Sequence, residues 1–185
     1  MKKVLLCFLV CMLIISIGLL SGCVKKGENI LLNSGFELGI NNKPFFWYQA
    51  VVPNDNLTML WDTTIFYNGS YSVGINNTHI YENDTCNNWA QRIYKVPIGR
   101  NIELIGWVKT IESEDVAMVI QCWDNKNTII GFGTTETSGS INGTNDWKEY
   151  NASVFVPYNT TRIIVRLVLC GTGQVWFDDV KLIIK

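Results

Sequence analysis

The closing stretch VWFDDVKLIIK, residues 175–185, places two adjacent aspartates inside an apolar, strand-like run. Neighbouring residues of a strand face opposite sides, so one of the two carboxylates must point toward the inside of the fold. Asp178 shares the strand phase of Val180 and Leu182, which predicts that it faces inward and that Asp179 faces outward. A buried carboxylate is costly unless it is paired, so a partner is expected elsewhere in the chain.

The rest of the chain reads as short β-strands separated by Gly, Asn, Asp and Thr turns, and no segment has the periodicity of an amphipathic helix. Many strands at regular spacing without intervening helices predict an all-β fold, an antiparallel jelly-roll β-sandwich. The expected strands are residues 30–32, 45–51, 57–61, 71–75, 89–96, 102–110, 116–123, 128–134, 147–156, 162–170 and 174–184.

Alternation along these strands separates an apolar inner set from an outer set of tryptophan, amide and charge. In residues 162–170, every second residue is apolar and Arg166 falls on the other side. The outer set comprises Trp89, Gln91, Trp107, Gln121, Trp123 and Arg166. An aromatic ring stacks on the C–H face of a sugar, while amide and guanidinium groups bind its hydroxyls, so this set predicts a carbohydrate-binding face. The alternative for any one tryptophan is a place in the core.

Five motifs occur in a characteristic order along the chain: NSGFELG at 33–39, YNGSYSVGI at 67–75, Trp107-Val108-Lys109, Trp147 to Tyr150 followed by Phe155, and Asp178 to Leu182. Together they resemble the carbohydrate-binding modules of the galactose-binding-like jelly-roll superfamily, in the group usually numbered four, nine and twenty-two. The resemblance implies a jelly roll that binds a glycan or polysaccharide without catalysing a reaction.

The same resemblance implies a structural calcium ion where the first and last strands meet. Its ligands would be Glu37, Asp178, backbone oxygens of residues 67–70 and Ser70. Such hard oxygen ligands are those that Ca²⁺ prefers. The alternative is that Asp178 accepts hydrogen bonds from backbone N–H groups of a neighbouring turn.

A basic start and an apolar run to Leu20 make residues 1–22 a secretory signal. Its end, LSGC, resembles the lipobox of prokaryotic lipoproteins, which implies cleavage before Cys23 and a lipid on its thiol. An uncleaved signal anchor is the alternative. Residues 23–29 then form a tether, and residues 30–185 form one domain outside the cytoplasm, anchored to the cell membrane.

Seven Asn-x-Ser/Thr sequons exceed the roughly two or three expected by chance and predict a glycosylated surface protein, with an archaeal origin favoured. They begin at Asn56, Asn68, Asn76, Asn83, Asn142, Asn151 and Asn159. Beyond Cys23 the chain has only Cys86, Cys122 and Cys170, so at most one intramolecular disulfide can form.

Other classes of function lack support in the sequence. The net charge is −1 and Lys and Arg do not cluster, which argues against nucleic-acid binding. His79 has no nucleophile motif to act with, and the adjacent Asp178 and Asp179 diverge too strongly to flank a glycosidic bond. We therefore expect that the protein is not an enzyme. The alternative to sugar binding is a structural or protein-interaction domain of the cell envelope with the same fold.

Overall fold

A computed structural model describes residues 25–50, 55–80 and 86–185. As predicted, it is nearly all antiparallel β-structure, with a single 3₁₀ turn, η1 (Thr135–Ser138), in the described ranges. The strands are β1 (Gly39–Ile40), β2 (Lys43–Pro44), β3 (Tyr48–Ala50), β4 (Leu57–Asp62), β5 (Ser72–Asn77), β6 (Asn87–Ile93), β7 (Asn101–Trp123), β8 (Ile129–Thr134), β9 (Ile141–Phe155), β10 (Arg162–Leu169) and β11 (Gly173–Ile184). Over these ranges, no helix is long and apolar enough to span a membrane.

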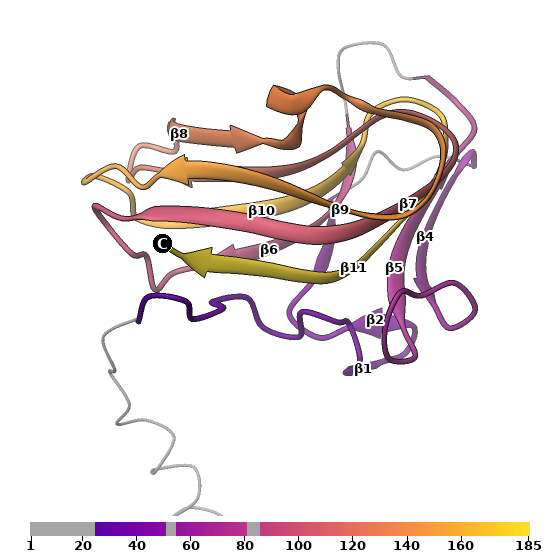
Figure 1. Cartoon of the computed structure of the whole chain (residues 1–185), viewed down its shortest axis with the longest axis horizontal. Coiled ribbons are helices and arrows are strands. Elements are labelled where there is room, and N and C mark those ends of the chain that lie inside the picture. Colours follow the sequence, from indigo (N-terminus) through magenta and orange to yellow (C-terminus); the bar gives the residue numbers. More distant parts are fainter. Residues whose placement is uncertain (1–24, 51–54, 81–85) are drawn as a thin grey trace, which may run out of the picture.

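Strand β7 is shared by the two layers of the sandwich. Its first half pairs with β11 and β9, and its second half pairs with β10 and β8. We call the layer ordered β4-β5-β11-β7-β9 sheet I, and the layer ordered β3-β6-β10-β7-β8 sheet II. Figure 1 shows β7 and β9 bending together at one end of the molecule.

The two strands expected at 102–110 and 116–123 are therefore one bent strand. The bend coincides with register shifts between Val108 and Val116 in the pairing with β9. Glu112 and Asp115 have positive φ angles of 49° and 57° within it. Bulges of this kind bend a strand and increase its twist, which is how one strand can serve two sheets.

The core lies between the sheets and follows the predicted alternation in β7 and β10. The inward residues are Ile102, Leu104, Val108, Val116, Met118, Ile120 and Cys122 from β7, and Ile163, Val165, Leu167 and Leu169 from β10, all of them fully buried. Burying apolar surface at about 25 cal/mol per Å² makes this cluster the main source of stability.

The two ends of the domain lie side by side, as expected. Residues 30–32 are not a strand, but the Ile30 N–H donates to the Leu182 carbonyl at 2.9 Å and the Val180 N–H donates to the Ser34 carbonyl at 3.0 Å. Figure 1 shows this opening segment running beside β11. The first and last parts of the domain are thus joined directly through their backbones.

Asp178 is fully buried, but the predicted reason is wrong. It pairs with Trp107, a residue on the outer side of sheet I, and the register shifts between Asp178 and Lys181. Asp179, with a φ of 47°, lies in the bulge that causes this shift. The bulge breaks the alternation, so Asp178 lies on the opposite side of the sheet from Val180, beneath the loop of residues 67–71.

One disulfide forms, between Cys86 just before β6 and Cys170 just after β10. Cys122 is a free thiol in the core. Burial raises the pKa of this thiol to about 11, so it stays protonated and unreactive at neutral pH.

Candidate functional site

A groove crosses the outer face of sheet II, and three of the predicted carbohydrate-binding residues line it: Gln121, Trp123 and Arg166. Its volume of about 650 Å³ is within the range of small-ligand sites, about 300–1,000 Å³. The lining residues are Cys86, Asn88, Ala117, Val119, Gln121, Trp123, Ile129, Phe132, Glu136, Arg166, Val168 and Cys170. They come from β6, β7, β8, β10 and η1, so the groove is built mainly on rigid strands.

The centre of the groove is polar and spans three strands. Half-buried Arg166 on β10 donates from Nε to Gln121 Oε1 on β7 and from Nη1 to Asn88 Oδ1 on β6, both at 2.9 Å. The Asn88 amide is fixed because its Nδ2 donates to the carbonyls of Ala50 and Cys86. Gln121 Oε1 also accepts from Trp123 Nε1 at 3.3 Å. The guanidinium is thus oriented before any ligand arrives.

Apolar groups surround this polar centre. Trp123 lines one end of the groove, and Arg162 lies over one side of its ring, 5.0 Å from the centroid. Phe132 on β8 is 52% exposed. The floor is made by Ala117, Val119 and Val168, against which the disulfide packs. A half-buried tryptophan and an exposed phenylalanine beside fixed amide and guanidinium groups suit a sugar, whose faces are apolar and whose rim is polar.

The same face continues beyond the groove toward the edge of sheet II. Arg166 pairs in register with Ala90, and Ala90 pairs with Tyr48 on β3. Beside Tyr48 lie Arg92 and Tyr94, and these three residues line a second, smaller hollow with Phe46. A chain-like ligand could therefore contact more than one site along the face.

Trp107 lies outside this groove. It is on the outer side of sheet I, where its ring stacks on Tyr67 at a centroid distance of 3.9 Å. The ring of Trp147 also packs against Tyr67, with a centroid distance of 6.0 Å. The predicted residue set is thus divided between the two opposite faces of the sandwich.

The expected outward placement of Trp89 and Gln91 is wrong. Both face the core, because they pair in register with the inward residues Leu167 and Val165. Trp89 is 0% exposed and its Nε1 donates to the Gly74 carbonyl at 3.0 Å. The Gln91 side chain accepts from the Leu32 N–H and donates to the Leu32 carbonyl. These two residues hold the fold together, and neither lines the groove.

Asn88 and Phe132 belong to the groove but were not predicted. Asn88 directly precedes the inward residue Trp89, so a correct phase for β6 would have placed Asn88 on the outer face. Phe132 pairs with Gln121 in register. Only the pairing between strands, which the sequence does not display, brings the two together.

The predicted metal-binding residues lie together around the loop of residues 67–71, but their polar groups face N–H donors. Glu37 Oε1 accepts from the N–H groups of Ser70 and Tyr71 at 3.0 and 3.1 Å. Asp178 Oδ2 accepts from the N–H groups of Tyr67 and Asn68 at 2.8 and 2.9 Å. Calcium needs six to eight oxygen ligands, and this loop offers N–H groups to the carboxylates, so the arrangement does not fit the ion.

Gly69 is required in this loop. Its φ of +77° disfavours other residues, and a Cβ there would clash with the Glu37 carboxylate. The arrangement corresponds to the alternative stated above, in which backbone N–H groups satisfy the buried aspartate. No observation tests calcium binding directly, so it remains a prediction of the family resemblance.

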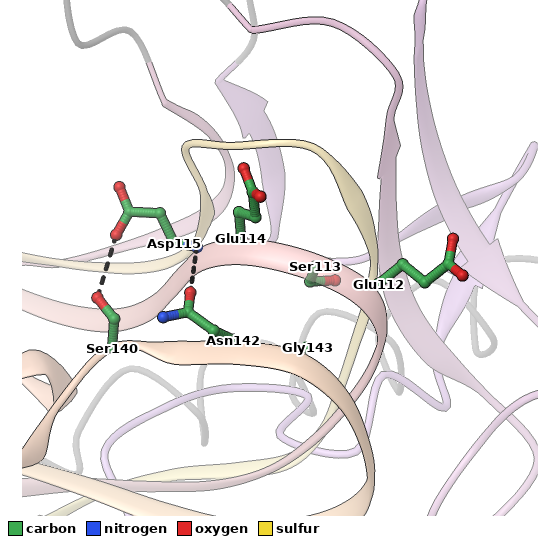
Figure 2. Close-up of a pocket in the computed structure, with 7 residues that line it drawn as sticks. All are labelled: Glu112, Ser113, Glu114, Asp115, Ser140, Asn142 and Gly143. Atoms are coloured by element: carbon green, nitrogen blue, oxygen red, sulfur yellow. Dashed lines mark hydrogen bonds between the residues drawn. The ribbon is translucent and has the colours of Figure 1, made fainter.

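A third hollow contains the acidic residues Glu112, Glu114 and Asp115 at the bend of β7. Figure 2 shows that their carboxylates do not converge: those of Glu112 and Asp115 point to opposite sides. Asp115 Oδ1 accepts from Ser140 Oγ at 3.3 Å. Within the described ranges, no group of three or more His, Cys, Asp or Glu side chains could hold a metal ion.

Cys23 and Asn83 lie outside the described residues. None of the other six sequon asparagines lines the groove. Asn151 is exposed on β9, and Asn68 lies in the loop that covers Asp178.

No family model matches the sequence, and no curated protein is similar to it in sequence. Solved structures do share the fold. The CBM22-1 xylan-binding domain from Paenibacillus barcinonensis Xyn10C matches with a TM-score of 0.59 and 12% identity, over 88% of this chain and 97% of that one. A putative sugar binding protein from Bacteroides thetaiotaomicron matches with a TM-score of 0.59 and 15% identity, over 85% and 100%.

The enzymatically active domain of tailspike protein 4 from bacteriophage CBA120 is also similar, with a TM-score of 0.64 and 18% identity. The match covers 85% of this chain and 21% of the tailspike chain. This chain therefore has the jelly-roll fold of carbohydrate-binding modules, a fold that also occurs inside larger enzymes.

Proposed function

We propose that this protein binds a polysaccharide, without catalysis, through the groove on sheet II. The observation that carries the proposal is the fixed Asn88–Arg166–Gln121 cluster beside Trp123 and Phe132. Its amide and guanidinium groups would bind hydroxyls while the rings contact the sugar face. Carbohydrate-binding modules of known structure share the fold, which supports the same conclusion.

A binding role fits the groove better than an enzymatic one. Glycoside hydrolysis generally needs two carboxylates about 5–9.5 Å apart that flank one bond. Glu136 is the only carboxylate residue that lines the groove on sheet II in the described chain. We expect no turnover of any polysaccharide that the groove binds.

Affinity electrophoresis of the full-length chain against a panel of polysaccharides tests the proposal. Retardation by at least one polymer is expected, and Trp123→Ala should abolish it. Trp107→Ala is the matched control, because this tryptophan lies on the opposite sheet and should leave retardation unchanged. If no polymer retards the protein, or if both variants lose retardation equally, sugar binding in the groove is contradicted. A structural or protein-interaction role in the envelope would then be favoured.

We also propose that the protein acts at the cell surface, anchored by a lipid on Cys23 or by an uncleaved signal. The LSGC sequence and the excess of sequons support this proposal. The wild-type protein should partition into detergent and carry a mass increase on Cys23, and Cys23→Ala should lack the modification. A signal anchor would instead keep residues 1–22 on the mature protein in both forms.

A further inference from the structure

We infer that the preferred ligand is an acidic polysaccharide, whose uronic-acid carboxylates contact Arg166. This inference rests on the proposed function and names the class of sugar. It follows from a difference in charge pairing between the two outer faces of the sandwich.

On sheet I and at the chain end, three lysines have carboxylate partners, whereas Lys148 on β9 lies over the Tyr150 ring. The ion pairs found in the described ranges are Lys109–Asp146, Lys181–Asp179 and Lys185–Glu103. None of them involves a residue of the face that holds the groove. Each of these three lysines therefore has its charge at least partly balanced within the protein.

On the outer face of sheet II, the arginines have only neutral partners among the described residues. Arg162 donates to Asn127 Oδ1 and to the Asp124 backbone carbonyl. Arg92 donates to the Tyr94 hydroxyl. Arg166 donates to two amide oxygens, as described above. Three positive charges of the described chain thus lie on one face without an ion pair, although a carboxylate is the partner whose geometry best matches a guanidinium.

Arg166 is the arginine best placed to meet a ligand. It is half-buried in the groove, so solvent screens its charge less than that of an exposed side chain. Its Nε and Nη1 are engaged, whereas Nη2 has no hydrogen-bond partner in the described chain. An unused, oriented donor on a guanidinium matches the acceptor oxygens of a carboxylate.

Glu136 is the one acidic residue that lines the groove, and it does not neutralise Arg166. It is exposed on η1 and its Oε2 accepts from Thr134 Oγ1 at 2.9 Å. No ion pair joins it to an arginine in the described chain. It lies at the rim, where it can accept hydrogen bonds from sugar hydroxyls.

The test compares three uronate polymers, polygalacturonate, alginate and glucuronoxylan, each with its own carboxyl-reduced derivative. Binding of the full-length chain is measured by titration calorimetry at a fixed salt concentration. We expect at least one acidic polymer to bind about tenfold or more tightly than its reduced form, as for a hydrogen bond to a charged group. Arg166→Gln should remove that difference, and Arg166→Lys should retain part of it.

Lys109→Gln is the matched control for general charge attraction, because it removes one positive charge from the opposite sheet. It should leave the preference intact, and a parallel loss in Lys109→Gln and Arg166→Gln would overturn the inference. Equal binding of native and reduced polymers, with loss in Trp123→Ala, would overturn the acidic preference but keep the groove as a sugar site. No binding to any polymer, native or reduced, would overturn both.

Discussion

Asp178 shows how one buried carboxylate can be kept in an apolar strand. Burial raises its pKa above 3.8, although N–H groups of Asn68, Asp179 and Tyr67 oppose this by stabilising the charged form. The sequence correctly predicted that Asp178 would be buried and need partners. It could not reveal the bulge at Asp179, because a bulge depends on pairing with the neighbouring strand.

Replacing Asp178 by Asn should destabilise the fold by about 1–3 kcal/mol, the cost of leaving buried groups unsatisfied. An Asn side chain has only one acceptor oxygen, whereas both Asp178 oxygens accept from N–H groups. The unfolding midpoint in urea measures the change. Asp179→Asn is the control, since that half-exposed side chain pairs only with Lys181 and its positive φ tolerates Asn. Equal midpoints for wild type and Asp178→Asn would contradict the role assigned to this carboxylate.

Protonation of Asp62 should make the folded protein less stable in acid. Burial would raise the pKa of this carboxyl, but hydrogen bonds from Thr64, Trp176 and Ile65 together lower it below 3.8. A lowered folded pKa gives stability that is present above pH 3.8 and is lost as the pH falls through the folded pKa. Melting temperatures at pH 6 and pH 3 should therefore differ less in Asp62→Asn than in the wild type. The same difference in both proteins would argue against this linkage.

At the scale of the element, period-two alternation predicted the inner and outer residues of β7 and β10 correctly. It failed for β6, where six of the seven residues are buried and the burial pattern does not alternate. Outward-facing Asn88 is covered in part by Arg166, which donates a hydrogen bond to it, and β3 lies beside Asn88 and Ala90 in the sheet. Alternation identifies faces only where one side is open to solvent, and β6 has neither side fully open.

The disulfide between Cys86 and Cys170 should contribute about 2–4 kcal/mol, because it closes a long loop with a sequence separation of 84 residues. The Cys86→Ala/Cys170→Ala double variant is expected to unfold at correspondingly lower urea concentration. Adding a reductant should lower the wild-type midpoint toward that of the variant and leave the variant unchanged. A variant with the wild-type midpoint would show that the bond adds nothing to stability.

At the scale of the whole molecule, the order of the motifs predicted a jelly roll whose two ends meet. It did not predict which tryptophans share a face, because that depends on strand pairing across the two sheets. Trp107 and Trp123 lie on the same strand and have the same alternation, yet the bend of β7 places them on opposite faces. The resulting molecule has one face with a groove and another that is closed by the loop over Asp178.

This closure should hold without a metal ion, because Glu37 and Asp178 bind the loop directly through its N–H groups. An ion present at a hundred times its Kd would add about 2.7 kcal/mol, which raises the melting temperature of a chain this size by about 5–10 °C. We therefore expect the melting temperature to be the same after treatment with EDTA and after addition of excess Ca²⁺, as measured by scanning calorimetry. A rise of that size on adding calcium, absent in Glu37→Gln, would instead place the ion between the two ends of the domain. In that case the loop of residues 67–71 would have to turn its carbonyl groups toward the carboxylates that its N–H groups now face.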